Sequence, residues 1–78
     1  MENDQYKTKD LSEASALVCA GAKLIRLESA SNFFYFVFLD KRRCEELSAS
    51  YWSGELQVSA KSYADSIRSL KDRLFARQ

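Results

Sequence analysis

The apolar residues of the chain are densest between Asn32 and Asp40, where seven apolar or aromatic residues follow one another without a break. This run is too short to cross a membrane as a helix. Its aromatic and β-branched content favours a buried strand over a helix. We therefore expect residues 33–39 to form the central strand of a sheet.

Two other stretches alternate with the period of a strand. Residues 5–9 alternate but carry two lysines, which is typical of an edge strand or a short ladder. Residues 23–28 alternate as well, and the short polar segment 29–32 joins them to the aromatic run. This arrangement predicts a β-hairpin.

The turn of this hairpin sets which side chains share a face. A loop of two or four residues places Leu27 opposite Phe34, Arg26 opposite Tyr35 and Leu24 opposite Val37. The more apolar face then carries Ile25, Leu27, Phe34, Phe36 and Phe38. The second face carries Leu24, Arg26, Phe33, Tyr35 and Val37.

Three segments show the period and the end signals of amphipathic helices. Asp10 with Glu13 resembles a capping box, and Gly21 can end the first helix. Asp40 can cap a second helix that stops at Gly54, and Ser59 can cap a last helix over about residues 60–76. The predicted buried stripes are Leu11, Ala14, Leu17 and Val18 in the first helix, Cys44, Leu47 and Tyr51 in the second, and Tyr63, Ile67, Leu70 and Leu74 in the third.

These elements predict a single α+β domain over residues 1–78, in the order β-α-β-β-α-(β)-α. The optional strand is Leu56–Val58, which can also be an extended connection. We expect a small, mainly antiparallel sheet with the helices packed on one face. The charged first strand suits an edge, whereas a ferredoxin-like arrangement places it in the centre.

Length and charge narrow the function. A chain of 78 residues forms a core that supplies about 3 to 5 kcal/mol of net stability without a staple or partner, so self-association is a reasonable expectation. The formal net charge of +1 arises from 12 basic and 11 acidic side chains. Because no global field attracts nucleic acid or membranes, an electrostatic site must be local.

The chain has two cysteines and no histidine. This composition removes the common zinc patterns and every histidine-dependent catalytic arrangement, and no glycine-rich loop can hold a nucleotide. We therefore expect no metal, no cofactor and no enzyme activity. The polar, acidic N-terminus differs from a signal peptide, and a single cysteine pair favours a reducing compartment, so we expect a cytoplasmic protein without a membrane segment.

The second face of the hairpin is the main candidate for a binding site. An uncovered patch of two aromatic residues, two aliphatic residues and an arginine is larger than soluble monomers usually expose. We expect a homodimer or a protein partner to bind there, through Arg26, Phe33 and Tyr35, with Trp52 as a further anchor. The alternatives are that the last helix or the chain ends cover this face, or that two copies pack sheet to sheet.

A second hypothesis is binding of single-stranded nucleic acid. Phe33 and Tyr35 would stack on bases, while Lys41, Arg42 and Arg43 would bind phosphate at the start of the second helix. The alternative, which the spacing favours, is a solvated helix face where Lys41 pairs with Glu45 and Arg42 with Glu46.

Several ordered features together resemble one protein family. They are Tyr6-x-Thr8-x-Asp10-Leu11, the helix ending at Gly21, Phe36-Val37-Phe38, Tyr51-x-x-Gly54, Val58, and the terminal Tyr63, Ile67 and Leu70-Lys71. The chain resembles, from Tyr6 to about Leu74, a small family of bacteria and their phages known as domain of unknown function 5659. This resemblance implies a small protein from a bacterial or mobile-element genome, and it implies no functional residues.

Overall fold

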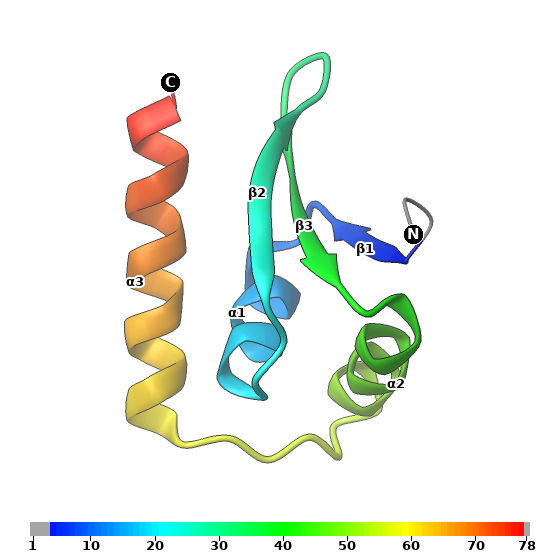
Figure 1. Cartoon of the computed structure of the whole chain (residues 1–78). Coiled ribbons are helices and arrows are strands. Elements are labelled where there is room, and N and C mark those ends of the chain that lie inside the picture. The colour runs from blue at the N-terminus through cyan, green and yellow to red at the C-terminus, as the bar shows by residue number, and fades with distance from the viewer. Residues whose placement is uncertain (1–3, 78) are drawn as a thin grey trace.

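The computed structural model describes residues 4–77, which form three strands and three helices in the order β-α-β-β-α-α (Figure 1). The elements are β1 (Gln5–Thr8), α1 (Leu11–Cys19), β2 (Leu24–Ser29), β3 (Phe34–Leu39), α2 (Lys41–Trp52) and α3 (Ala60–Arg77). The predicted α+β class is confirmed. A turn at Ser53 and Gly54 leads into an irregular connection over residues 55–59, so Leu56–Val58 is not a strand.

The aromatic strand β3 lies in the centre of the antiparallel sheet, whose order is β1-β3-β2. β3 is paired with a strand at each edge, and its Phe36, Val37 and Phe38 are fully buried, in agreement with the most apolar sequence of the chain. The charged strand β1 lies at an edge, as its lysines indicated.

The predicted register of the hairpin is wrong by two residues. Leu27 lies opposite Phe36 rather than Phe34, and Glu28, not Arg26, lies opposite Tyr35. The turn is centred one residue further along the chain than predicted, because the Ala30 N–H donates to the Phe33 carbonyl at 2.8 Å. A shift by an even number of residues leaves each side chain of β3 on its predicted face.

An irregularity between Leu24 and Arg26 changes two predicted placements, that of Leu24 and that of Ile25, which has no partner residue in β3. The register shifts between these two residues, as in a β-bulge, and Leu24 lies opposite Phe38. Leu24 packs against the core, so its predicted place on the open face is wrong. Bulges add a residue to one strand and re-aim the side chains beside it.

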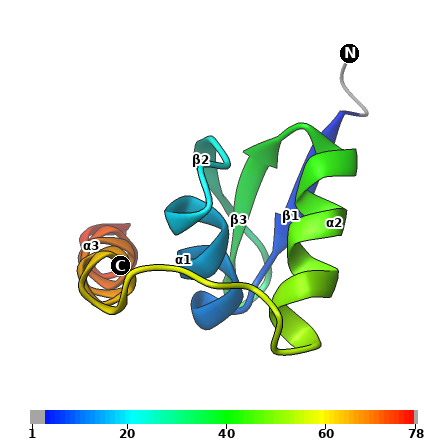
Figure 2. The ribbon, with the colours of Figure 1, turned by 90° about the horizontal axis from the view of Figure 1, so that it is seen from below.

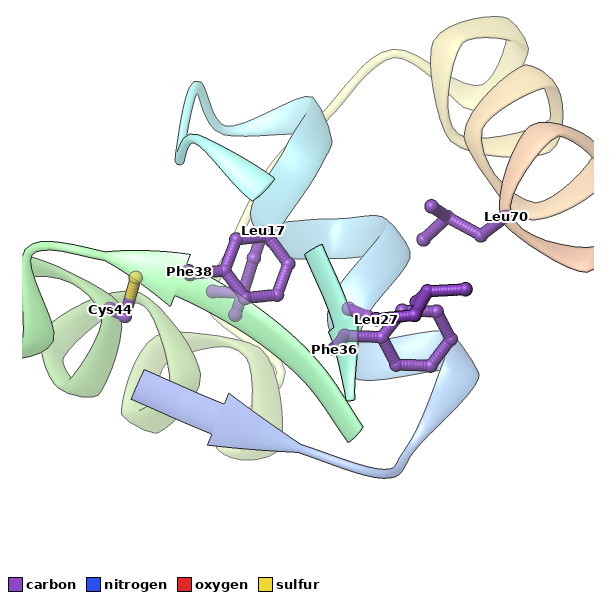
Figure 3. Close-up of a cluster of buried hydrophobic side chains, with 7 residues drawn as sticks. Leu17, Leu27, Phe36, Phe38, Cys44 and Leu70 are labelled. Atoms are coloured by element: carbon purple, nitrogen blue, oxygen red, sulfur yellow. The ribbon is translucent and has the colours of Figure 1, made fainter. Parts of the chain in front are cut away.

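The core lies between the sheet and the helices. Figure 3 shows Phe38 beside Leu17 of α1, Phe36 beside Leu27 of β2, and Leu70 directed from α3 toward Leu27. The fully buried members are Ala14, Leu17, Phe36, Phe38 and Cys44. The predicted stripes of the helices are therefore confirmed where they meet the sheet.

The helices begin where the sequence predicted. The side chains of Asp10 and Asp40 accept hydrogen bonds from the N–H groups of Glu13 and Arg43. Ser59 Oγ accepts from the Ser62 N–H at 3.3 Å. Asp40 adopts a left-handed backbone with φ of 69°, which aspartate tolerates better than most residues.

The three helices do not share the sheet equally. α1 and α2 contribute Leu17 and Cys44 to the cluster on one face of the sheet. α3 packs on the outer side of α1, on the opposite side of α1 from α2, as Figure 2 shows. The other face of the sheet carries no helix among residues 4–77.

Candidate binding surfaces

The open face of the sheet carries a group of charged side chains that form salt bridges. The Glu28 carboxylate accepts from Lys7 Nζ at 2.6 Å and from Arg26 Nη2 at 3.0 Å. The hydrogen bond from Lys7 lowers the pKa of Glu28 most, and the hydrogen bond from Arg26 lowers it further. Gln5 Oε1 lies 3.3 Å from Arg26 Nη2, so this polar group joins β1 and β2 across β3.

The aliphatic part of the predicted patch is not exposed. Val37 lies between Lys7 and Arg26 in the sheet, yet its exposed fraction is 0%. The alkyl stems of long cationic side chains commonly cover apolar surface in this way. The predicted exposure of Leu24 and Val37 on this face is wrong, because a bulge turns Leu24 to the core and Val37 is fully buried.

The aromatic part of the patch remains at the end of the hairpin. The rings of Phe33 and Tyr35 are half-buried and meet edge to face, with centroids 5.1 Å apart. Lys9 Nζ lies 4.9 Å from the centre of the Phe33 ring, a cation–π contact. Arg26 is paired with Glu28, and Glu28 lies opposite Tyr35 in the sheet. The structure thus brings Arg26, Phe33 and Tyr35 to one face.

Trp52 lies elsewhere, at the C-terminal end of α2. Its exposed fraction is 61%, and its ring meets Tyr51 edge to face at 4.9 Å. Tyr51 is half-buried, and burial together with a hydrogen bond to Tyr63 raises its pKa. The Tyr63 hydroxyl donates to the Ser12 carbonyl at 3.2 Å. Tyr51 therefore belongs to the packing between helices, whereas Trp52 is free to meet a partner.

The basic start of α2 is exposed, but several of its polar groups have partners. Asp40 Oδ1 accepts from the Arg43 N–H at 3.2 Å, and Asp4 Oδ1 accepts from the Lys41 N–H at 3.2 Å. The Arg43 guanidinium donates to the Ala20 carbonyl at 3.0 Å. Arg42 lies 3.8 Å from Glu46. Two carboxylates thus occupy backbone donors that a phosphate would need.

A buried carboxylate that the sequence did not reveal joins β1 to α1. Glu13 is 4% exposed and accepts from the Tyr6 hydroxyl at 2.5 Å and from Thr8 Oγ1 at 2.7 Å. Tyr6 Oη is also hydrogen-bonded to Ser48 Oγ of α2 at 3.1 Å. Burial, followed by the bond to Glu13, raises the pKa of Tyr6. The available signal was that Tyr6 and Thr8, two residues apart, share a face of β1.

This network also changes the predicted capping box. The Glu13 N–H donates to Asp10 Oδ1 at 2.8 Å, as a capping box requires. The Asp10 N–H donates to Thr8 Oγ1 at 3.1 Å instead of to Glu13, because the Glu13 carboxylate is directed to Tyr6 and Thr8. We interpret this group as a structural clamp, since both donors are already satisfied.

Both cysteines are free thiols. Cys44 is fully buried and donates to the Leu39 carbonyl at 3.4 Å. Burial, with a smaller effect of Asp40, raises the pKa of its thiol. Cys19 is half-buried and lies 3.4 Å from Ser66 Oγ. Within residues 4–77, no three histidine, cysteine or carboxylate side chains gather as a metal site would require.

Two further apolar side chains are exposed. Leu39 is 42% exposed at the end of β3, and Phe75 is 65% exposed near the end of α3. Phe75 borders a shallow groove along one side of α3, which is lined by Ala64, Ile67, Arg68, Lys71, Asp72 and Phe75. None of the described helices is both long enough and apolar enough to span a bilayer.

The fold and these surfaces define a small α+β domain with one helix-covered and one charged, open sheet face. The chain belongs to the family described as Domain of unknown function (DUF5659), whose family model matches residues 3–76. The resemblance seen in the sequence is thereby confirmed. Searches of curated proteins and of solved structures found no match.

Proposed function

We propose that this protein is a non-catalytic binding module of the bacterial or phage cytoplasm, and that its open sheet face binds another protein. The observation that carries this proposal is the half-buried Phe33–Tyr35 pair on a sheet face that no described helix covers. Aromatic and arginine side chains supply most of the binding energy at protein interfaces.

The charges of this face favour a particular kind of partner. Lys9 lies over Phe33, Lys7 and Arg26 lie on the same face of the sheet, and Glu28 is the acidic residue that pairs with both of them. Two copies that met face to face would bring these cations against one another. A partner with acidic side chains around an apolar one complements the face better than a second copy does.

A second candidate function is binding of single-stranded nucleic acid. The observation that favours it is the combination of two aromatic rings with three cations on one sheet face. The edge-to-face geometry and the Lys9 ammonium over Phe33 leave less flat ring surface for a base than a stacking platform offers. Lys41, Arg42 and Arg43 would extend the phosphate contacts along the start of α2.

A peptide selection tests the first candidate. Peptides selected from a random display library on the wild-type protein should be rich in acidic and apolar residues. Arg26→Glu and Tyr35→Ala should weaken their binding at least tenfold, measured by fluorescence anisotropy. Phe75→Ser is the matched control, because it removes an exposed aromatic ring from α3 and should leave affinity unchanged. The proposal would be refuted if the selected peptides bound both open-face variants with the same affinity as the wild-type protein.

Oligonucleotides separate the two candidates. The second candidate predicts that the protein binds short oligo-dT and that this affinity falls steeply with salt. It also predicts that Arg42→Glu and Arg43→Glu abolish the binding. Binding of acidic peptides with little effect of these two substitutions supports the first. Tyr35→Ala does not discriminate, since both candidates use this ring.

A further inference from the structure

The outer edge of β1 presents free backbone groups. In an antiparallel pair, successive residues alternately bond across the pair and point away from it. The Asp40 N–H donates to the Asp4 carbonyl at 3.1 Å, so Asp4, Tyr6 and Thr8 direct their backbone groups toward β3. The N–H and C=O groups of Gln5 and Lys7 therefore point to the opposite edge.

The two edges of the sheet are not equivalent. α3 lies on the β2 side of the molecule (Figure 1), and its Leu70 belongs to the same buried cluster as Leu27 of β2 (Figure 3). The β-α-β-β-α portion of the chain follows the ferredoxin-like motif, which continues into a last strand beside the first. Here residues 53–59 lead into α3 instead, and no strand within residues 4–77 occupies that place.

The neighbouring flank of α2 is also uncovered. α2 runs beside β1 in the same direction (Figure 2), and its Ser48 is hydrogen-bonded to Tyr6. At about 100° per residue, Lys41, Glu45 and Trp52 lie on the same side of α2 as Ser48. All three are exposed. We call Lys41, Glu45, Ser48 and Trp52 the outer flank of α2.

We propose that the free edge of β1 pairs with β1 of a second copy of the chain, about a two-fold axis at Tyr6. Gln5 of each copy then lies opposite Lys7 of the other, and each such pair exchanges two backbone hydrogen bonds. The two sheets join into one, and the outer flanks of the two α2 helices meet in antiparallel orientation. This brings the Lys41 ammonium of one copy to the Trp52 ring of the other, a cation–π contact.

The charges of β1 allow this register. Lysines on an edge strand usually oppose pairing with another strand. The Lys7 ammonium, however, lies 2.6 Å from Glu28 of its own sheet, which compensates its charge. The two-fold axis at Tyr6 also places Lys7 beside the neutral Gln5 of the second copy instead of beside its Lys7.

The proposed dimer extends the proposed function without depending on it. Joining two sheets edge to edge leaves both open faces uncovered and side by side. Each dimer therefore presents two Phe33–Tyr35 sites, which strengthens binding to a partner with repeated acidic segments through avidity.

Proline and alanine at position 5 provide a matched test. Gln5→Pro removes only a donor that points away from β3, so it blocks the second copy while keeping the β1–β3 bonds. It removes two hydrogen bonds from the dimer, and we expect roughly a thirtyfold weaker dimer by sedimentation velocity across a dilution series. Gln5→Ala keeps the donor and loses the same side chain, including its contact with Arg26. This variant should dimerise like wild type.

Wild-type protein supplies an independent readout. The amides of Gln5 and Lys7 should exchange with solvent quickly at low concentration and slowly at high concentration, measured by NMR. Trp52→Ser should weaken the dimer, whereas Phe75→Ser should not. These measurements keep the test decisive even if Gln5→Pro does not fold.

Three results would overturn the proposal. They are a monomer at every concentration, a dimer that Gln5→Pro does not weaken, and a dimer in which the Gln5 and Lys7 amides still exchange quickly. Arg26→Glu and Tyr35→Ala should leave the dimer intact. Failure of the dimer is therefore distinguishable from failure of the open-face proposal, which peptide affinity measures.

Discussion

The clamp around Glu13 offers the sharpest test of how this small domain holds together. Glu13 is a nearly buried carboxylate whose two side-chain donors, Tyr6 and Thr8, come from β1. Tyr6→Phe keeps the ring in the core and removes the hydroxyl that lies 2.5 Å from Glu13. The perturbation therefore removes the hydrogen bond to the buried Glu13 carboxylate, together with the hydrogen bond to Ser48 Oγ, while it creates almost no cavity.

The expected magnitude follows from the bond and the size of the domain. A hydrogen bond to a charged group contributes about 1.5 to 3 kcal/mol, and the loss of a donor leaves the buried carboxylate less satisfied. We expect Tyr6→Phe to lower the free energy of unfolding by about 2 kcal/mol. Since a domain of this size has about 3 to 5 kcal/mol in total, the melting temperature should fall by roughly 8 to 16 °C.

Urea denaturation at neutral pH, followed by circular dichroism, measures this loss. A double-mutant cycle with Glu13→Gln isolates the pair, and we expect a coupling free energy of about 1 kcal/mol or more. Tyr35→Phe is the matched control, because it removes a tyrosine hydroxyl from the open face and should change stability by less than about 0.5 kcal/mol. A loss below about 0.5 kcal/mol for Tyr6→Phe, or a coupling near zero, would refute the clamp.

Acid should break the salt bridges of the open face by protonating Glu28. Because the pKa of Glu28 lies below 4.5 in the folded chain, the unfolded chain binds this proton first, so the stability from these ions is fully present above about pH 4.5 and is lost as pH falls through the folded pKa. An NMR titration should give the Glu28 carboxyl a pKa below 4.5, and Lys7→Ala should raise this pKa. A pKa that Lys7→Ala leaves unchanged would contradict the ion pair. Leu70→Ala should cost about 2 to 4 kcal/mol by creating a cavity under α3, measured by thermal unfolding, and a loss under about 1 kcal/mol would mean that α3 is not part of the core. Cys44 should react with a thiol reagent more slowly than Cys19, because it is buried and its pKa is raised; equal rates in the native protein would contradict this burial.

The sequence determined the elements of this protein, because each rests on interactions between neighbours along the chain. Asp10 and Ser59 cap helices through bonds to N–H groups three residues away, and local chemistry of this kind is visible in the sequence. The central place of β3 was also predictable, since a run of seven consecutive apolar residues suits a strand that has a neighbouring strand at each edge.

Only the tertiary structure decided which surfaces remain open. The position of the hairpin turn and the bulge near Leu24 depend on how β2 meets the core, and a pattern of period two fits several registers equally well. The partners of Glu13 and Glu28 come from strands and helices distant in sequence, so no local pattern specifies them. For the same reason the four predicted anchors separated: Arg26, Phe33 and Tyr35 share the open face, whereas the path of α2 carries Trp52 to another side of the molecule.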